Sequence, residues 1–156
     1  MERKYLAHYL DTAFSSASPT YELLGKDLEE YTEELNPDVE IKKNINGETS
    51  IRVKGYEPQS EVDPYYYDYE DALSEKLETI ANERQTGDEL RTSKVDVWLN
   101  KDGTCLKAYR EDIVVVPNSL GGDTSGVQIP FTIYNAGNRV KGTFDVKTKK
   151  FTPVEE

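Results

Sequence analysis

The residues most able to do chemistry in this sequence stand in the glycine-rich stretch 121–126, which reads Gly-Gly-Asp-Thr-Ser-Gly. A nucleotide-type phosphate loop needs a lysine after its last glycine, and Val127 stands there instead. An aspartic protease needs a glycine directly after Asp-Thr or Asp-Ser, whereas here a serine intervenes before Gly126. The stretch therefore predicts a structural turn. A dimeric aspartic hydrolase built on Asp123 is the weaker, enzymatic alternative.

His8 and Cys105 are the sole histidine and cysteine of the chain. No Gly-x-Ser-x-Gly elbow accompanies the histidine, so we expect His8 to be packed or at the surface rather than catalytic. One cysteine cannot form an internal disulfide, and the pair offers too few soft ligands for zinc. The acids Asp68, Glu70 and Asp71 lack the alternation and central glycine of a calcium loop. We expect no catalytic residue, no metal and no cofactor.

The most aromatic stretch is 64–69, which reads Pro-Tyr-Tyr-Tyr-Asp-Tyr. Exposed tyrosines anchor protein interfaces or stack on sugars. Tyr65, Tyr66 and Tyr67 are therefore the candidate interface residues. The alternatives are that they pack the entry to a following helix or, less readily, that they bind sugar.

Charge and composition exclude several classes of protein. The net charge is −11, and all of the excess lies in residues 1–94, because residues 95–156 hold equal numbers of acids and bases. Such a chain would repel nucleic acid rather than bind its phosphates. The longest purely apolar run is Ile113–Val116, so we expect neither a membrane span nor a signal peptide, and a protein kept in the cytosol.

The length of 156 residues predicts a single domain over 1–156. Its core should be thin, because Leu, Ile, Val and Phe make up about 22% of the chain, barely above the level at which charged chains tend to disorder. Contacts with partners would then complete the burial of apolar surface.

Strand patterns dominate the sequence, and the first hairpin is predicted over 39–55. A three-residue loop 45–47, with Gly47 in the left-handed conformation, satisfies the alternation of apolar residues. This register pairs four apolar residues on one face, Ile41 with Ile51 and Val39 with Val53.

Two further hairpins are predicted. The second spans 95–109 with a four-residue loop 100–103, and it pairs Val97 with Leu106 and Val95 with Ala108. A strand with apolar residues on both faces follows over Ile113–Val116 and stops at Pro117. The third hairpin spans 127–146 and reverses near Ala136-Gly137, which pairs Ile133 with Val140, Ile129 with Phe144, Val127 with Val146, and Phe131 with Gly142.

One helix is predicted from the spacing of Leu73, Leu77, Ile80 and Arg84, with Asp68 as the candidate N-cap and an end at Thr86-Gly87. Residues 24–35 also show helical spacing, but Gly25 and Pro37 bracket that stretch poorly. A helix with one apolar stripe packs across a sheet. The predicted fold is therefore mainly β (α+β), an antiparallel β-sandwich or partial barrel with one packed helix.

Several strings taken together resemble the major tail proteins, or tail tube proteins, of long-tailed bacteriophages of Gram-positive hosts. The most specific are 110–117, Arg-Glu-Asp-Ile-Val-Val-Val-Pro, and the stretch 121–131 that follows; the others are 3–12, 24–28, 35–37 and 44–48. The resemblance covers nearly the whole chain and implies a tail-tube fold without the C-terminal immunoglobulin-like decoration domain of longer members. It also makes 24–35 strand and loop rather than helix.

The resemblance implies a structural subunit and not an enzyme. Six copies would close a ring, and rings would stack around the tape-measure protein into a tube that conducts viral DNA into the host. The other implied partners are a tail terminator and tail tip or baseplate initiator proteins, with no membrane. The protein would belong to the virion tail and be assembled in the host cytoplasm.

A hypothesis about the bore follows from the charge. Some acidic side chains of residues 1–94 would line it, and their repulsion of phosphates would keep passing DNA from binding. The alternative class is a carbohydrate-binding β-sandwich module.

Overall fold

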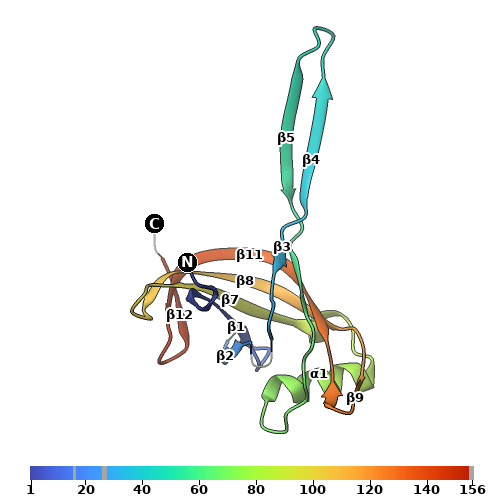
Figure 1. Ribbon diagram of the computed structural model, residues 1–156, viewed down its shortest axis with the longest axis vertical. Coiled ribbons are helices and arrows are strands. Elements are labelled where there is room, and N and C mark those ends of the chain that lie inside the picture. The colour runs from blue at the N-terminus through green and yellow to red at the C-terminus, as the bar shows by residue number, and fades with distance from the viewer. Residues whose placement is uncertain (16, 26–27, 155–156) are drawn as a thin grey trace.

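The computed structural model describes residues 1–15, 17–25 and 28–154. Its body is a curled antiparallel sheet with one covering helix (Figure 1). This confirms the partial barrel with one packed helix. The strands follow one another across the sheet in the order β2 (Tyr21–Leu24), β1 (Leu6–Asp11), β7 (Arg91–Leu99), β8 (Cys105–Pro117), β11 (Phe131–Asp145), β6 (Gln59–Val62) and β3 (Glu33–Glu34), and β12 (Lys150–Pro153) also pairs with β11.

Helix α1 (Ala72–Glu83) buries Leu73, Leu77 and Ile80, as its spacing predicts. Its N-cap is Asp71, whose side chain accepts from the backbone N–H of Leu73, so the predicted cap at Asp68 is wrong. The Asp68 carboxylate instead accepts from the N–H of Glu70, in the turn before the helix. The chain also forms two short 3-10 helices, η1 (Arg3–Tyr5) and η2 (Gly87–Leu90).

The buried apolar residues form two clusters rather than one. The larger cluster joins α1 to the sheet and contains Phe131, Ile113, Val115, Leu73 and Leu77. The smaller cluster lies toward the β12 end and contains Tyr9, Tyr21, Val95, Val97, Ala108 and Phe144. Each cluster is small, which agrees with the thin core predicted from composition.

The hairpin of β7 and β8 forms where it was predicted, but the predicted register is wrong. Val97 lies opposite Ala108 rather than Leu106. The loop has three residues, because Asn100 donates to the carbonyl of Thr104, and a bulge beside Leu99 then shifts the pairing. A loop with an odd number of residues, followed by one bulged residue in the strand, gives the same alternation of apolar residues as a loop with an even number. The sequence pattern therefore could not tell the two apart.

The third predicted hairpin does not form. Residues 131–145 make one continuous strand, β11, which pairs with β8 from Phe131 opposite Pro117 to Gly142 opposite Ala108. The expected reversal at Ala136-Gly137 is a bulged region within that strand. Phe131 therefore does not cover Gly142. The ring of Phe151 on β12 lies against that glycine instead.

The described residues 24–25 and 28–35 are strand and loop, as the resemblance implied, and none of them is helical. The stretch begins at the end of β2 and contains β3, and residues 26–27 lie outside the described part of the chain.

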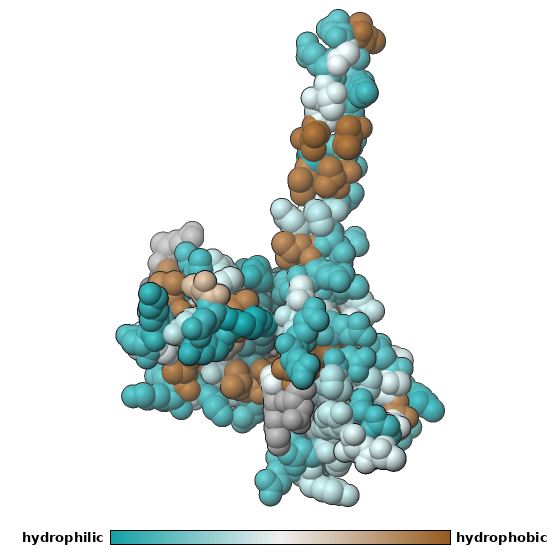
Figure 2. All heavy atoms as spheres, viewed as in Figure 1, coloured by the Kyte–Doolittle hydropathy of each residue, from teal (hydrophilic) through white to brown (hydrophobic). Residues whose placement is uncertain are grey.

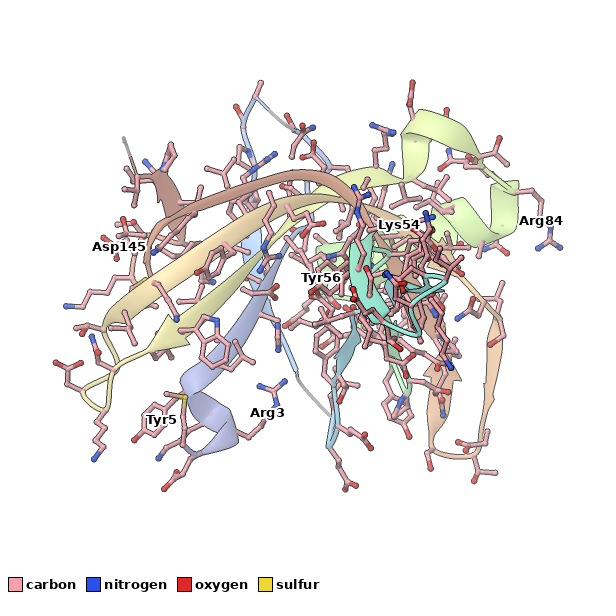
Figure 3. All side chains as sticks on the ribbon, turned by 90° about the horizontal axis from the view of Figure 1, so that it is seen from above. Arg3, Tyr5, Lys54, Tyr56, Arg84 and Asp145 are labelled. Atoms are coloured by element: carbon pink, nitrogen blue, oxygen red, sulfur yellow. The ribbon has the colours of Figure 1, made fainter. Side chains whose placement is uncertain are left out.

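The first predicted hairpin forms with the predicted register. Strands β4 (Pro37–Lys43) and β5 (Thr49–Tyr56) pair Val39 with Val53 and Ile41 with Ile51, and Gly47 has a φ of 79° in the loop. These strands form a sheet of their own and stand out from the body (Figure 1). We call residues 37–56 the arm. Seen from above, the arm stands over the half of the molecule that holds α1, away from the end marked by Asp145 (Figure 3).

Candidate functional site

The expectation that His8 is packed rather than catalytic agrees with its surroundings. Its Nδ1 lies 2.7 Å from Oδ1 of Asp96, and its Nε2 lies 2.8 Å from a guanidinium nitrogen of Arg3. Because arginine can only donate, Nε2 must accept, which places the imidazole proton on Nδ1 facing the carboxylate. Both ring nitrogens are therefore engaged: Nδ1 holds β1 to β7, and Nε2 holds β1 to η1.

Asp96 and Lys94 continue this contact into a buried polar network. Burial disfavours the charged carboxylate, but the hydrogen bond from His8 and the ammonium of Lys94 outweigh it and lower the pKa of Asp96. Burial likewise favours the neutral amine, yet Asp96 and the neighbouring Glu33 keep the pKa of Lys94 raised. Lys94 also bonds Glu33, which lies on β3 a few residues before the arm. The network thus ties the root of the arm to the centre of the sheet.

The arm exposes a stripe of aliphatic side chains. Val39 and Val53 are 47% and 49% exposed, and Ile41 and Ile51 are 64% and 68% exposed. Figure 2 shows this stripe as a hydrophobic patch along the arm. The pairing of these residues on one face was predicted correctly, and the pairing of two strands does not say whether a third element covers that face.

The opposite face of the arm is charged. Glu40 lies opposite Arg52, and it also holds Lys42 at 3.0 Å and Lys54 at 3.4 Å. Over its whole length the arm carries four basic and three acidic side chains, so it is slightly positive on a strongly negative protein.

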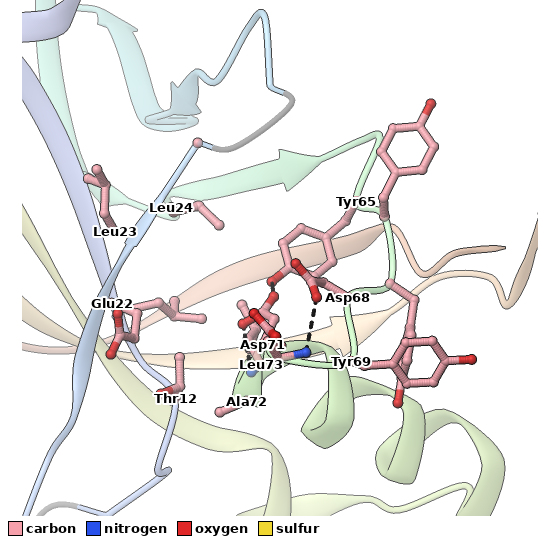
Figure 4. Close-up of a pocket in the computed structure, with 15 residues that line it drawn as sticks. Thr12, Glu22, Leu23, Leu24, Tyr65, Asp68, Tyr69, Asp71, Ala72 and Leu73 are labelled. Atoms are coloured by element: carbon pink, nitrogen blue, oxygen red, sulfur yellow. Dashed lines mark hydrogen bonds between the residues drawn. The ribbon is translucent and has the colours of Figure 1, made fainter. Parts of the chain in front are cut away.

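A groove with a volume of about 530 Å³ lies between β2 and the start of α1 (Figure 4). Leu23 and Leu24 form one wall, the segment 65–69 forms the other, and Leu10 and Leu73 also line it. We call it the tyrosine groove. Its acidic residues are Glu22, Asp68, Glu70 and Asp71.

The three tyrosines predicted as interface residues all line this groove, but none is fully exposed. Tyr65 packs edge-on against Phe131, with ring centroids 5.2 Å apart, and its hydroxyl bonds Asp71. Burial and that hydrogen bond raise the pKa of Tyr65. Tyr67 also packs against the larger core cluster. These contacts agree with the alternative of packing at the helix entry, and an interface role for Tyr65, Tyr66 and Tyr67 stays a prediction.

The residue that the sequence reasoning missed is Tyr69, which is 94% exposed at the groove. Its ring meets that of Tyr67 edge-on at 5.4 Å. It belongs to the same aromatic stretch, but its side chain points away from the core, and nothing in the sequence distinguishes it from its neighbours. Leu23, 60% exposed on β2, was missed because no strand was predicted over 21–24.

The glycine-rich stretch 121–126 is the turn that was predicted. It joins β9 (Gly121–Asp123) to β10 (Gly126–Gln128), and Oδ1 of Asp123 accepts from the N–H of Ser125 at 2.8 Å. Gly122 has a φ of 141° and lies against the backbone of Gly126. The close approach of β9 and β10 thus explains why glycine stands at positions 122 and 126.

No group of three or more His, Cys, Asp and Glu side chains in 1–15, 17–25 and 28–154 is placed to hold a metal ion. In the same residues, no helix is both long and apolar enough to cross a membrane.

No protein-family model and no curated protein matches the sequence. The solved structures that share its fold include two tube terminators. One is the tube-terminating cap of the anti-feeding prophage, with a TM-score of 0.55 and 12% identity over 92% of this chain and 91% of that chain. The other is the sheath/tube terminator of an extracellular contractile injection system, PVC, in its extended state, with a TM-score of 0.56 and 10% identity over 90% and 95%. The chain therefore has the tail-tube-related fold that its resemblance implied.

Proposed function

We propose that this protein is a ring-forming terminator, a structural component that caps the end of the tube in a phage tail or tail-like injection particle. The observation that carries the proposal is the fold likeness to two tube terminators over nine tenths or more of both chains in each pair. The finer role suggested by the sequence resemblance, a repeating major tail protein, becomes the second candidate.

The architecture supports a ring. A curled sheet that stops at half a barrel leaves open edges, here β2 at one end and β3 at the other. Natural proteins cover or pair such edges, and copies arranged around an axis do so by closing one barrel. The number of copies implied by the resemblance is six. The partners of such a cap are the tube subunits below it and, in a contractile particle, the sheath.

The charge supports passage of DNA through such a ring without binding. Every copy contributes a net charge of −11, and acidic side chains on the inner wall would repel the phosphates of a passing duplex. In a particle that delivers protein instead of DNA, the same wall would act on that cargo.

The second candidate is favoured by the motifs 110–117 and 121–131, which resemble those of major tail proteins. In that role hexameric rings would stack around the tape-measure protein, and a different protein would be the terminator. A cap and a repeating subunit share a fold but differ in where they lie along the tube. The location of this chain in the particle therefore distinguishes the two candidate functions.

The experiment is immunogold labelling of intact particles that carry a peptide tag on this chain. A tag in the turn 101–103, between β7 and β8, avoids the arm and the tyrosine groove. A terminator places gold at one end of each tube. Labelling along the whole tube would establish the repeating subunit, and untagged particles control for non-specific gold.

A further inference from the structure

The arm carries an apolar surface that no other described element covers. Each side chain of its aliphatic stripe is about half or more exposed; these are Val39, Ile41, Ile51 and Val53. Neither β4 nor β5 pairs with any other described strand. An isolated two-stranded ribbon is marginally stable in water. A partner surface that buries the stripe would therefore order the arm as well as bind it.

The tyrosine groove has the features that such a ribbon needs. Its walls are apolar and aromatic, with Leu23 and Tyr69 both open to solvent. One wall is β2, the last strand at its end of the sheet order, so its outer backbone groups can pair with an added strand. Strand addition at a sheet edge, with side chains entering adjacent pockets, is a common mode of peptide recognition.

Charge complements shape at these two surfaces. Basic residues alternate with the apolar ones on the arm, as in Ile51-Arg52-Val53-Lys54. The groove combines apolar walls with acidic residues, among them Glu22 on β2, which pairs with Lys149 at 3.0 Å, and Glu70, next to Tyr69 in sequence. The slightly positive arm and the acidic groove attract each other, which favours their encounter.

The arm cannot reach the groove of its own chain. In the view of Figure 1 it rises upward from the top of the body, near β3, whereas β2 and α1 lie toward the bottom of the body. The longer arm strand has eight residues and spans about 26 Å when extended, all of it directed away from the body. A surface and its complement on opposite sides of one chain make a head-to-tail contact, which closes into a ring when the rotation between copies permits.

The geometry points to a second copy of this chain as the occupant: the arm of one subunit seats its aliphatic stripe in the tyrosine groove of the next. This inference rests on the proposed ring and names the contact that builds it. It also gives the aromatic stretch 64–69 a double role, in which Tyr65 packs the core of its own subunit and Tyr69 receives the neighbour.

The test uses two variants of the full chain, each lacking one half of the contact. The arm variant is Ile41→Ser with Ile51→Ser, and the groove variant is Leu23→Ser with Tyr69→Ser. All four side chains are exposed, so both variants should fold, which circular dichroism checks. The matched control is Leu106→Ser with Val127→Ser, two exposed apolar residues outside the arm and groove.

Sedimentation velocity reads the outcome. The wild type and the control form rings, and each variant alone self-associates about a hundredfold more weakly. An equimolar mixture of the two variants gives one-to-one dimers and nothing larger, because only one intact arm and one intact groove remain to meet.

Two results would overturn the inference while leaving the proposed function intact. One is rings formed by both variants as readily as by the wild type. The other is variants that still form rings but no longer bind tubes, which would make the tube protein the occupant of the arm or groove. A folded wild type that stays monomeric at every concentration would overturn both the inference and the proposed ring.

Discussion

The ammonium of Lys94 lies 3.4 Å from Oδ2 of Asp96, two residues further along β7, and the Lys94 side chain is only 2% exposed. Glu33, in the segment that leads to the arm, is the second acid at the same ammonium. A charge buried this completely is stable only while its partners are in place. Electrostatics in the interior thus helps to hold the root of the arm, beside the apolar packing of Tyr31 in the larger cluster.

Replacing Lys94 should therefore be costly. Lys94→Ala leaves Glu33 and Asp96 without their buried cation, and we expect the free energy of unfolding in urea to fall by about 3–5 kcal/mol. The control is Lys42→Ala, which removes an exposed ion pair with Glu40 and should cost at most about 1 kcal/mol. Equal losses in the two variants would refute the structural importance of the buried network.

Acid should weaken the fold through Asp96. The pKa of this carboxyl is lowered in the folded state, so its stabilising contribution is full above the ordinary value of 3.8 and is lost as the pH falls through the lower folded pKa. We expect the urea midpoint to drop as the pH falls below about 4. The drop should be smaller in Asp96→Asn, and an unchanged pH dependence in that variant would contradict the assignment.

Gly142 should not tolerate a side chain. A Cβ there would lie 2.6 Å from the ring of Phe151 and would also meet the backbone of Thr152. Because the backbone cannot move aside cheaply, Gly142→Ala should destabilise the protein by about 1–3 kcal/mol. Gly55→Ala, in the arm, has nothing within 4 Å of the added carbon and should change thermal stability little. A neutral Gly142→Ala would place β12 elsewhere.

Asp71 should matter more to α1 than a simple surface acid. Its carboxylate accepts from the N–H of Leu73 at 3.1 Å and from the hydroxyl of Ser74 at 3.0 Å, and it also bonds Tyr65. Asp71→Ala should cost about 1–2 kcal/mol, measured by thermal unfolding, whereas Asp71→Asn keeps an oxygen at the cap and should cost much less. If the two substitutions cost the same, the cap is not the source of the effect.

The part of the fold that could be predicted is the part set by neighbours in sequence. Asn46-Gly47 gave the register of the arm, and the spacing of Leu73, Leu77 and Ile80 gave the buried face of α1. Both features depend on local geometry, on a glycine with positive φ in one case and on the helical repeat in the other.

The errors arose where a distant strand decides between two local readings. Gly137 and Asn138 both have positive φ, as a tight turn would, yet they form a bulge because β8 offers a partner along the whole length of β11. The second wall of the tyrosine groove was missed for the same reason. The sequence shows neither that the arm leaves the body nor that β2 lies across a groove from Tyr69, since both depend on how the sheet curls.

The central claim, that this chain caps a tube rather than building it, is tested most directly by counting its copies in purified particles whose tubes differ in length. Quantitative mass spectrometry against the particle's other structural proteins gives that count. The proposal predicts a single ring of copies per particle, unchanged as the tubes lengthen. A copy number that rises in proportion to tube length would contradict it and identify the chain as the repeating subunit.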